Sequence, residues 1–178
     1  MDVLAHTLWA NAGAKKLNSQ FEKNNREKIS LKWASFFGVF PDLFAFGIPM
    51  LISLYALFQD NLTFENFSHH GLPGQFDLAS TLYNYSHSFV TFILVGVGIY
   101  LFTKKIKWVL LGWPLHILLD IPTHPVDFYP TPFLWPVSNY VFPYGFSWGE
   151  PWFMFINYFS LLSILDLLYR KQKSANSI

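Results

Sequence analysis

The pattern His116-x3-Asp120-x3-His124 spaces three potential metal ligands four residues apart. His116 and Asp120 stand at i and i+4, so a helix would carry both side chains on one face. Pro122 is expected to end or kink that helix, which lets the chain fold His124 back toward Asp120. Imidazole and carboxylate groups suit zinc and other divalent transition metals. The stretch therefore predicts the centre of a metal site, with Asp120 and His124 as the candidates for catalysis.

Other ionisable residues lie within, or at the start of, apolar segments. Such residues are costly inside a membrane and are candidates for a functional site. The chain has no cysteine, so any metal site must use His, Asp and Glu. We therefore predict the following metal ligands: His6, Asp42, His87, His116, Asp120 and His124. Carbonyl groups freed by Pro41 and Pro114 are expected to accept hydrogen bonds from the second ring nitrogens of the histidines.

The composition is that of a membrane protein. Of the 178 residues, 52% are hydrophobic and only 13% are charged, about half the usual ~25% share. This excludes an ordinary soluble enzyme, and the 20% aromatic content excludes a disordered chain. The net charge of +1 gives no sign of a nucleic-acid partner. We predict one domain, residues 1–178, folded as an all-α polytopic helical bundle in the lipid bilayer.

Four apolar segments are predicted to cross the membrane: Trp33 to Phe58, His87 to Phe102, Trp108 to Ile121 and Trp152 to Tyr169. The run Val3 to Ala14 is too short to cross and is predicted to be a half-membrane helix, capped by Asp2. Its small residues suit close packing between membrane helices. His69 and His70 lie in a Gly-rich stretch and are expected to be solvated loop residues without a role.

The basic residues predict the orientation of these helices. All 12 lysines and arginines lie in the stretches 15–32, 104–107 and 170–173, whereas the stretches 59–86 and 122–151 contain none. The positive-inside rule then places the basic N-terminal segment and the C-terminus in the cytoplasm, with the protein in the inner membrane. His6, Asp42 and His116 each lie nine or ten residues from a basic anchor, which puts them about 13–15 Å from the cytoplasmic face.

These residues resemble the motifs of a prokaryotic family described as membrane-bound, metal-dependent hydrolases. The ordered motifs are present here as His6-Thr7, Pro41-Asp42, His87-Ser88, the stretch from His116 to Thr123, and Leu134-Trp135-Pro136. The set is also similar in pattern to the zinc-dependent phospholipase C and nuclease superfamily, whose members share a multi-zinc site. That superfamily's N-terminal Trp ligand, and its His-x3-Glu beyond the position of His124, are missing here. The resemblance therefore implies one or two ions, most readily zinc.

The resemblance implies a hydrolase, and the location suggests its substrate. A site open to the bilayer and the outer leaflet gives access to an ester or phosphodiester of a lipid or lipid-linked substrate. Two alternatives stay open. A proton- or ion-coupled transporter would also keep His and Asp near the midplane. A non-enzymatic membrane assembly protein could use the same residues as a structural His/Asp network. The oligomeric state stays open as well.

The absence of cysteine makes the predicted orientation directly measurable. A single cysteine introduced by Gln20→Cys or Ser174→Cys should react with an impermeant maleimide only after the inner membrane has been permeabilised, because both positions lie in or beside basic stretches. Asn139→Cys should react in intact cells after removal of the outer barrier. Reaction of Asn139→Cys from the cytoplasmic side alone would contradict the arrangement.

Overall fold

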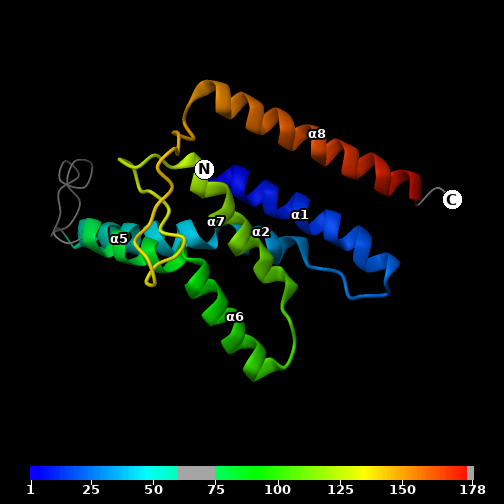
Figure 1. The fold of residues 1–178 in the computed structure, drawn as a ribbon, viewed down its shortest axis with the longest axis horizontal. Helices are drawn as coiled ribbons and strands as arrows, with labels where there is room; N and C mark the ends of the chain where they lie inside the picture. Colours follow the sequence, from blue (N-terminus) through cyan, green and yellow to red (C-terminus); the bar gives the residue numbers. More distant parts are fainter. Residues whose placement is uncertain (60–74, 176–178) are drawn as a thin grey trace.

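The structure is a computed structural model that describes residues 1–59 and 75–175. It is built from helices and loops (Figure 1), with no strand in those residues, which confirms the all-α prediction. The helices are α1 (Val3–Lys23), α2 (Leu31–Asp42), α3 (Ile48–Phe58), α5 (Gln75–Ser86), α6 (Phe89–Thr103), α7 (Gly112–Thr123) and α8 (Pro151–Ala175). A π-helical turn (Leu43–Gly47) joins α2 to α3, and a 3-10 turn (Trp108–Leu111) precedes α7. His69 and His70 lie outside the described residues.

Two helices are long and apolar enough to cross a membrane. They are the continuous helix Leu31–Phe58, formed by α2, the π-helical turn and α3, and the first part of α8, Pro151–Lys171. A third crossing results if α5 and α6, which meet at a bend of 63°, are counted together as one broken span. The apolar helix Trp108–Thr123 is shorter. The structure is thus consistent with a membrane protein, while four crossings stay a prediction.

Helix α1 is longer than predicted. The sequence pattern ended it at Ala14, but the helix continues through the polar stretch that follows. Leu17 and Phe21 continue the inward face of Ala14 at helical spacing. Phe21 is buried in a small core with Ile29 and Ala34, and Leu17 packs against that core. This packing stabilises the polar continuation of the helix.

The start of α1 is tied to α8. Asp2 caps α1 as predicted, since its Oδ1 accepts a hydrogen bond of 2.9 Å from the Ala5 backbone N–H. The same oxygen accepts a bond of 2.7 Å from the Tyr158 hydroxyl of α8. One residue earlier on α8, Asn157 Oδ1 accepts a 2.8 Å hydrogen bond from Trp9 Nε1. These contacts hold α8 alongside α1, as Figure 1 shows.

Glycine allows α1, α2 and α7 to approach one another closely. A Cβ added to Gly38 of α2 would lie 2.5 Å from Ala10 Cβ and 2.9 Å from the His6 carbonyl oxygen of α1. A Cβ added to Gly112 of α7 would lie 2.7 Å from the Gly38 nitrogen. All three distances are shorter than real Cβ contacts, so neither position has room for a side chain. The close approach brings His6 and α7 to the same part of α2.

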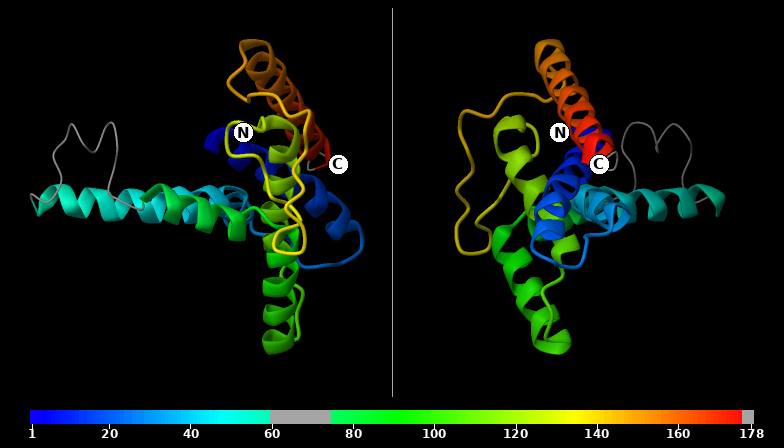
Figure 2. Two further views of the ribbon diagram at one scale, coloured as in Figure 1. Left: turned by 60° about the vertical axis from the view of Figure 1, so that its left-hand side comes forward. Right: turned by 90° about the vertical axis from the view of Figure 1, so that its right-hand side faces the viewer.

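The bend between α5 and α6 is built by Ser88. Its Oγ accepts hydrogen bonds from the backbone N–H groups of Val90 and Thr91, at 3.1 and 3.2 Å, and so caps α6. The Phe89 N–H donates to the Phe133 carbonyl at 2.9 Å. Figure 2 shows that α5 and α6 run in different directions. His87 lies at the bend, held between the end of one helix and the cap of the next.

The glycine contact gives a stability prediction with a matched control. Gly38→Ala adds a methyl group where none fits, and overpacking of this kind costs about 1–3 kcal/mol. The better helix propensity of alanine returns at most about 1 kcal/mol. We therefore expect a lower melting temperature in detergent for Gly38→Ala. Gly96→Ala in α6 has no atom within 4 Å of the added Cβ, so its melting temperature should be unchanged or slightly higher. Equal effects of the two substitutions would contradict the packing argument.

Candidate metal centre

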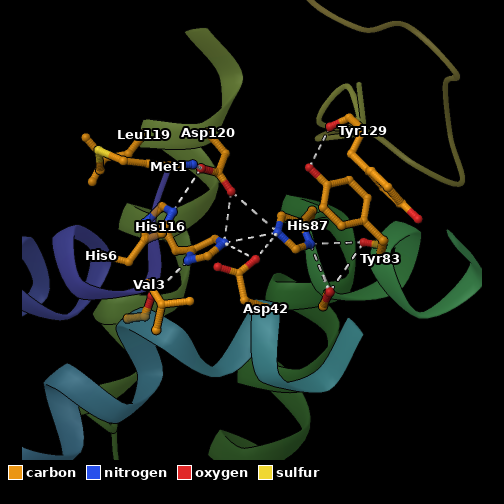
Figure 3. Close-up of polar contacts among 12 residues, drawn as sticks. Met1, Val3, His6, Asp42, Tyr83, His87, His116, Leu119, Asp120 and Tyr129 are labelled. Carbon is orange, nitrogen blue, oxygen red and sulfur yellow. Dashed lines mark hydrogen bonds and ion pairs between the residues drawn. The ribbon is translucent and has the colours of Figure 1, made fainter. Parts of the chain in front are cut away.

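The six predicted ligands lie in one cluster. Figure 3 shows the members of the cluster other than His124. They come from separate parts of the chain: His6 from α1, Asp42 from the last residue of α2, His87 from the α5–α6 bend, His116 and Asp120 from α7, and His124 from the residue after α7. Asp120 lies at the centre of the cluster and is fully buried. Both of its carboxylate oxygens face histidine nitrogens.

Four of these residues form a group that could hold a metal ion: Asp42, His87, His116 and Asp120. Their ligand atoms all lie within 4.8 Å of one another. His116 Nε2 is 3.0 Å from Asp120 Oδ2 and 3.7 Å from Asp42 Oδ1. His87 Nε2 is 3.5 Å from each of the two carboxylates. These separations are short enough for one metal ion to contact all four groups.

The hydrogen bonds of the outer ring nitrogens show why a cation fits. His116 Nδ1 lies 2.8 Å from the Gly38 carbonyl, and His87 Nδ1 lies 3.2 Å from the Tyr83 carbonyl. A carbonyl only accepts, so a neutral His116 carries its proton on Nδ1 and a bare lone pair on Nε2. His87 takes the same form when its Nδ1 donates to the Tyr83 carbonyl rather than accepting from the Ser86 hydroxyl, which lies 2.9 Å away. The two Nε2 atoms nevertheless face each other at 3.0 Å. Two lone pairs beside two carboxylates repel one another unless a cation or extra protons lie among them.

The acceptors of these bonds differ from the predicted ones. The sequence pointed to carbonyls freed by Pro41 and Pro114, but the observed acceptors are Gly38 and Tyr83. The cause is the close approach of Gly112 to the α2 backbone, because His116 follows Gly112 by about one helical turn and so reaches Gly38. The predicted kind of acceptor, a backbone carbonyl, is confirmed.

The other oxygen of Asp120 faces a second set of groups. Oδ1 lies 2.9 Å from His6 Nε2 and 3.6 Å from His124 Nε2. The backbone nitrogen of Met1 also contacts this oxygen and lies 3.1 Å from His124 Nε2. Although His6 is close to Asp120, the pair lacks hydrogen-bond geometry, and both ring nitrogens of His6 are buried without a hydrogen-bond partner. The His6 ring instead stacks on His116, with centroids 3.7 Å apart.

His124 reaches the cluster by a route that differs in detail from the prediction. Pro122 does not end the helix; α7 continues to Thr123, and His124 is the first residue with extended backbone angles. The loop that follows returns over this end, where the Trp148 N–H donates to the Thr123 carbonyl at 3.1 Å. Burial lowers the pKa of His124 below its ordinary value. The imidazole is therefore neutral at pH 7, which is the form that binds metals and accepts protons.

Two tyrosines support the cluster, and the sequence analysis missed both. The Tyr83 ring stacks on His87 with centroids 3.7 Å apart, and its hydroxyl donates to the Tyr129 carbonyl at 2.8 Å. That carbonyl also lies 2.9 Å from His124 Nδ1, so it can accept hydrogen bonds from both the Tyr83 hydroxyl and the His124 ring. Tyr129 has a φ of 46°, a left-handed conformation that is strained for a non-glycine residue and here aims its carbonyl at the site. The sequence could have pointed to Tyr83, because it precedes His87 by four residues and so lies on the same helix face. Nothing in the sequence marks Tyr129.

No known relative informs this site. Comparison of the chain with protein-family models, with curated proteins and with solved structures found no match. The interpretation therefore rests on the cluster itself. Its central finding is that Asp42, His87, His116 and Asp120 together could hold a metal ion.

Proposed function

We propose that the protein is a membrane-bound, metal-dependent hydrolase that uses zinc. The observation that carries this proposal is the group of two histidines and two carboxylates, in which the Nε2 atoms of His87 and His116 face each other at 3.0 Å beside Asp42 and the buried Asp120. A divalent cation satisfies all four groups at once. The resemblance of the ordered motifs to a family of membrane-bound metal-dependent hydrolases supports the same conclusion. A metal in such a site activates water near neutral pH and polarises the oxygen of an ester or phosphodiester.

We infer a second ion position on the other side of Asp120. Its two oxygens face different partners: Oδ2 faces His87 and His116, whereas Oδ1 faces His6 and His124. A carboxylate arranged in this way can bridge two ions. The buried, unpartnered nitrogens of His6 support this position, because buried polar atoms are normally satisfied.

The chain's own residues have distinct roles in this proposal. Asp120 holds and orients the metal site from its centre. His124 is the candidate proton acceptor, because its Nδ1 is fixed by the Tyr129 carbonyl and its Nε2 faces the cluster, where it also lies 3.1 Å from the Met1 nitrogen. Asp42 is on the accessible side: its side chain is 13% exposed, whereas Asp120 is fully buried. A substrate would therefore approach past Asp42.

The surroundings of the cluster support a lipid or lipid-linked substrate. A cavity of about 480 Å³ lies beside Tyr83 and Tyr129, the residues that support His87 and His124. Its walls include Asn84, Asp127 and Trp135, so it offers both polar and aromatic surface to a headgroup. The apolar exterior of the candidate spans would leave the rest of such a substrate in the bilayer.

We further infer that the chain crosses the inner membrane four times, with its basic ends in the cytoplasm. The distribution of lysine and arginine supports this orientation. The hydrolytic site would then face the outer half of the membrane. The helix Trp108–Thr123 would form the third crossing, although it is shorter than the others.

Metal content is the first test of the proposal. Asp120→Asn and His116→Ala each remove a ligand, and even the loss of a residue that only orients a ligand costs about 10–100-fold in metal affinity. We expect purified, dialysed protein of either variant to be almost free of metal by elemental analysis. Asp166→Asn is the matched control, because Asp166 lies on the surface and pairs with Arg170 at 2.7 Å. Wild-type metal content in both ligand variants would refute the metal site.

Activity tests the rest of the proposal. Zinc-loaded protein should hydrolyse chromogenic esters or phosphodiesters in mixed micelles, lose activity with a chelator and regain it with zinc. His124→Ala should retain metal at the group of four but lose about 10²–10⁴-fold in rate, as expected for removal of a general base. Proton or ion flux in liposomes without hydrolysis and without stoichiometric metal would instead favour a transporter.

A further inference from the structure

Helices α1 and α8 form a wedge that is closed at one end and open at the other. At the closed end, Ala5 and Leu161 are completely buried in one cluster, and Trp9 is hydrogen-bonded to Asn157. Toward their C-terminal ends, cavities separate the two helices. Figure 1 shows that both helices run in the same direction, so their C-terminal ends lie on the same side of the molecule.

The deeper part of the wedge is an apolar crevice of about 700 Å³. On the α1 side it is lined by Ala12 and Gly13, whose small side chains leave the space open. On the α8 side it is lined by Ile164 and Leu167, and Leu115 of α7 contributes to its wall. The volume lies within the 300–1,000 Å³ typical of ligand sites. The crevice is therefore large enough for part of an apolar chain.

The open end of the crevice is basic. A second cavity of about 550 Å³ shares Lys16, Leu168 and Lys171 with the first, and its walls also include Lys15 and Lys23. Among the described residues of these walls, the one carboxylate is Glu22, which forms an ion pair of 2.9 Å with Lys28. Among the described residues, Lys16 and Lys171 form no ion pair. Positive charge thus remains uncompensated where the apolar crevice opens.

We propose that this crevice binds one anionic phospholipid, with an acyl chain between α1 and α8 and the phosphate between Lys16 and Lys171. Charge complementarity selects this occupant, since basic pockets between membrane helices bind anionic headgroups, and the continuous apolar crevice accounts for the chain. None of the six cluster residues lines either cavity. The lipid site is therefore separate from the metal centre and does not depend on the proposed hydrolase activity.

Native mass spectrometry of the full chain in detergent, titrated with phosphatidylglycerol or phosphatidylcholine, tests this inference. Each lysine near an anionic headgroup contributes about a fivefold change in affinity, so Lys16→Gln/Lys171→Gln should weaken phosphatidylglycerol binding by about thirtyfold. Binding of phosphatidylcholine should change little. Lys104→Gln/Lys105→Gln removes the same charge from the α6–α7 connection, outside both cavities, and should leave phosphatidylglycerol binding as in the wild type.

A third variant tests the acyl-chain part of the site. A Cβ on Gly13 would meet its nearest neighbour, Leu115 Cδ2, at 3.6 Å, which is an ordinary contact. The Cβ of Gly13→Leu therefore fits, and its longer side chain should extend into the crevice and weaken phosphatidylglycerol binding while leaving the lysines in place. An equal loss of phosphatidylglycerol affinity in the two double-lysine variants would show general attraction to the basic surface and overturn the proposal. So would competition by glycerol phosphate as effective as that by the intact lipid, or unchanged binding in Gly13→Leu.

Discussion

The cost of burying the Asp120 carboxylate shapes this molecule. An ionised carboxylate taken out of water is stable only if cationic or hydrogen-bonding groups replace its hydration. The described residues offer no lysine or arginine partner to Asp120; its neighbours are histidines and the Met1 backbone nitrogen. His116 and His124 direct the lone pair of Nε2 toward Asp120, because the Nδ1–H of each ring donates to a backbone carbonyl. The cluster is thus electrostatically incomplete as a set of neutral histidines, and four of its residues could hold a metal ion.

The rest of the fold serves to bring these groups together. Gly38 and Gly112 remove the side chains that would keep α1 and α7 away from α2. Ser88 caps α6 and creates the bend at which His87 points inward. The π-helical turn directly after Asp42 adds a local irregularity at the site, as such turns frequently do at functional positions. Each of these features is local, and all of them lie beside the His/Asp cluster.

Helix α8 has a different relation to the site. It is anchored to α1 through Tyr158 and Asn157 near the candidate metal centre, but it diverges from α1 toward the basic end. The contacts near the cluster are hydrogen bonds with good geometry, whereas the far end is a crevice with lysines at its mouth. A lipid in that crevice would complete the packing of α8 against the bundle. The protein would then have a rigid end at the metal centre and a lipid-dependent end at the basic surface.

The amino-acid sequence was enough to predict the helical class, the presence of apolar helices suited to a membrane, and the side chains that form the cluster. These follow from composition, from the i, i+4 spacing of His116 and Asp120, and from the cost of ionisable residues in apolar segments. Only the tertiary structure decided the length of α1, the division of the Asp120 oxygens between two sets of histidines, and the carbonyls of Gly38 and Tyr129 that orient the rings. The physical reason is that backbone carbonyls carry no residue identity. Which carbonyl reaches a given imidazole depends on how closely two helices approach and on one strained dihedral, and neither can be read from the order of residues.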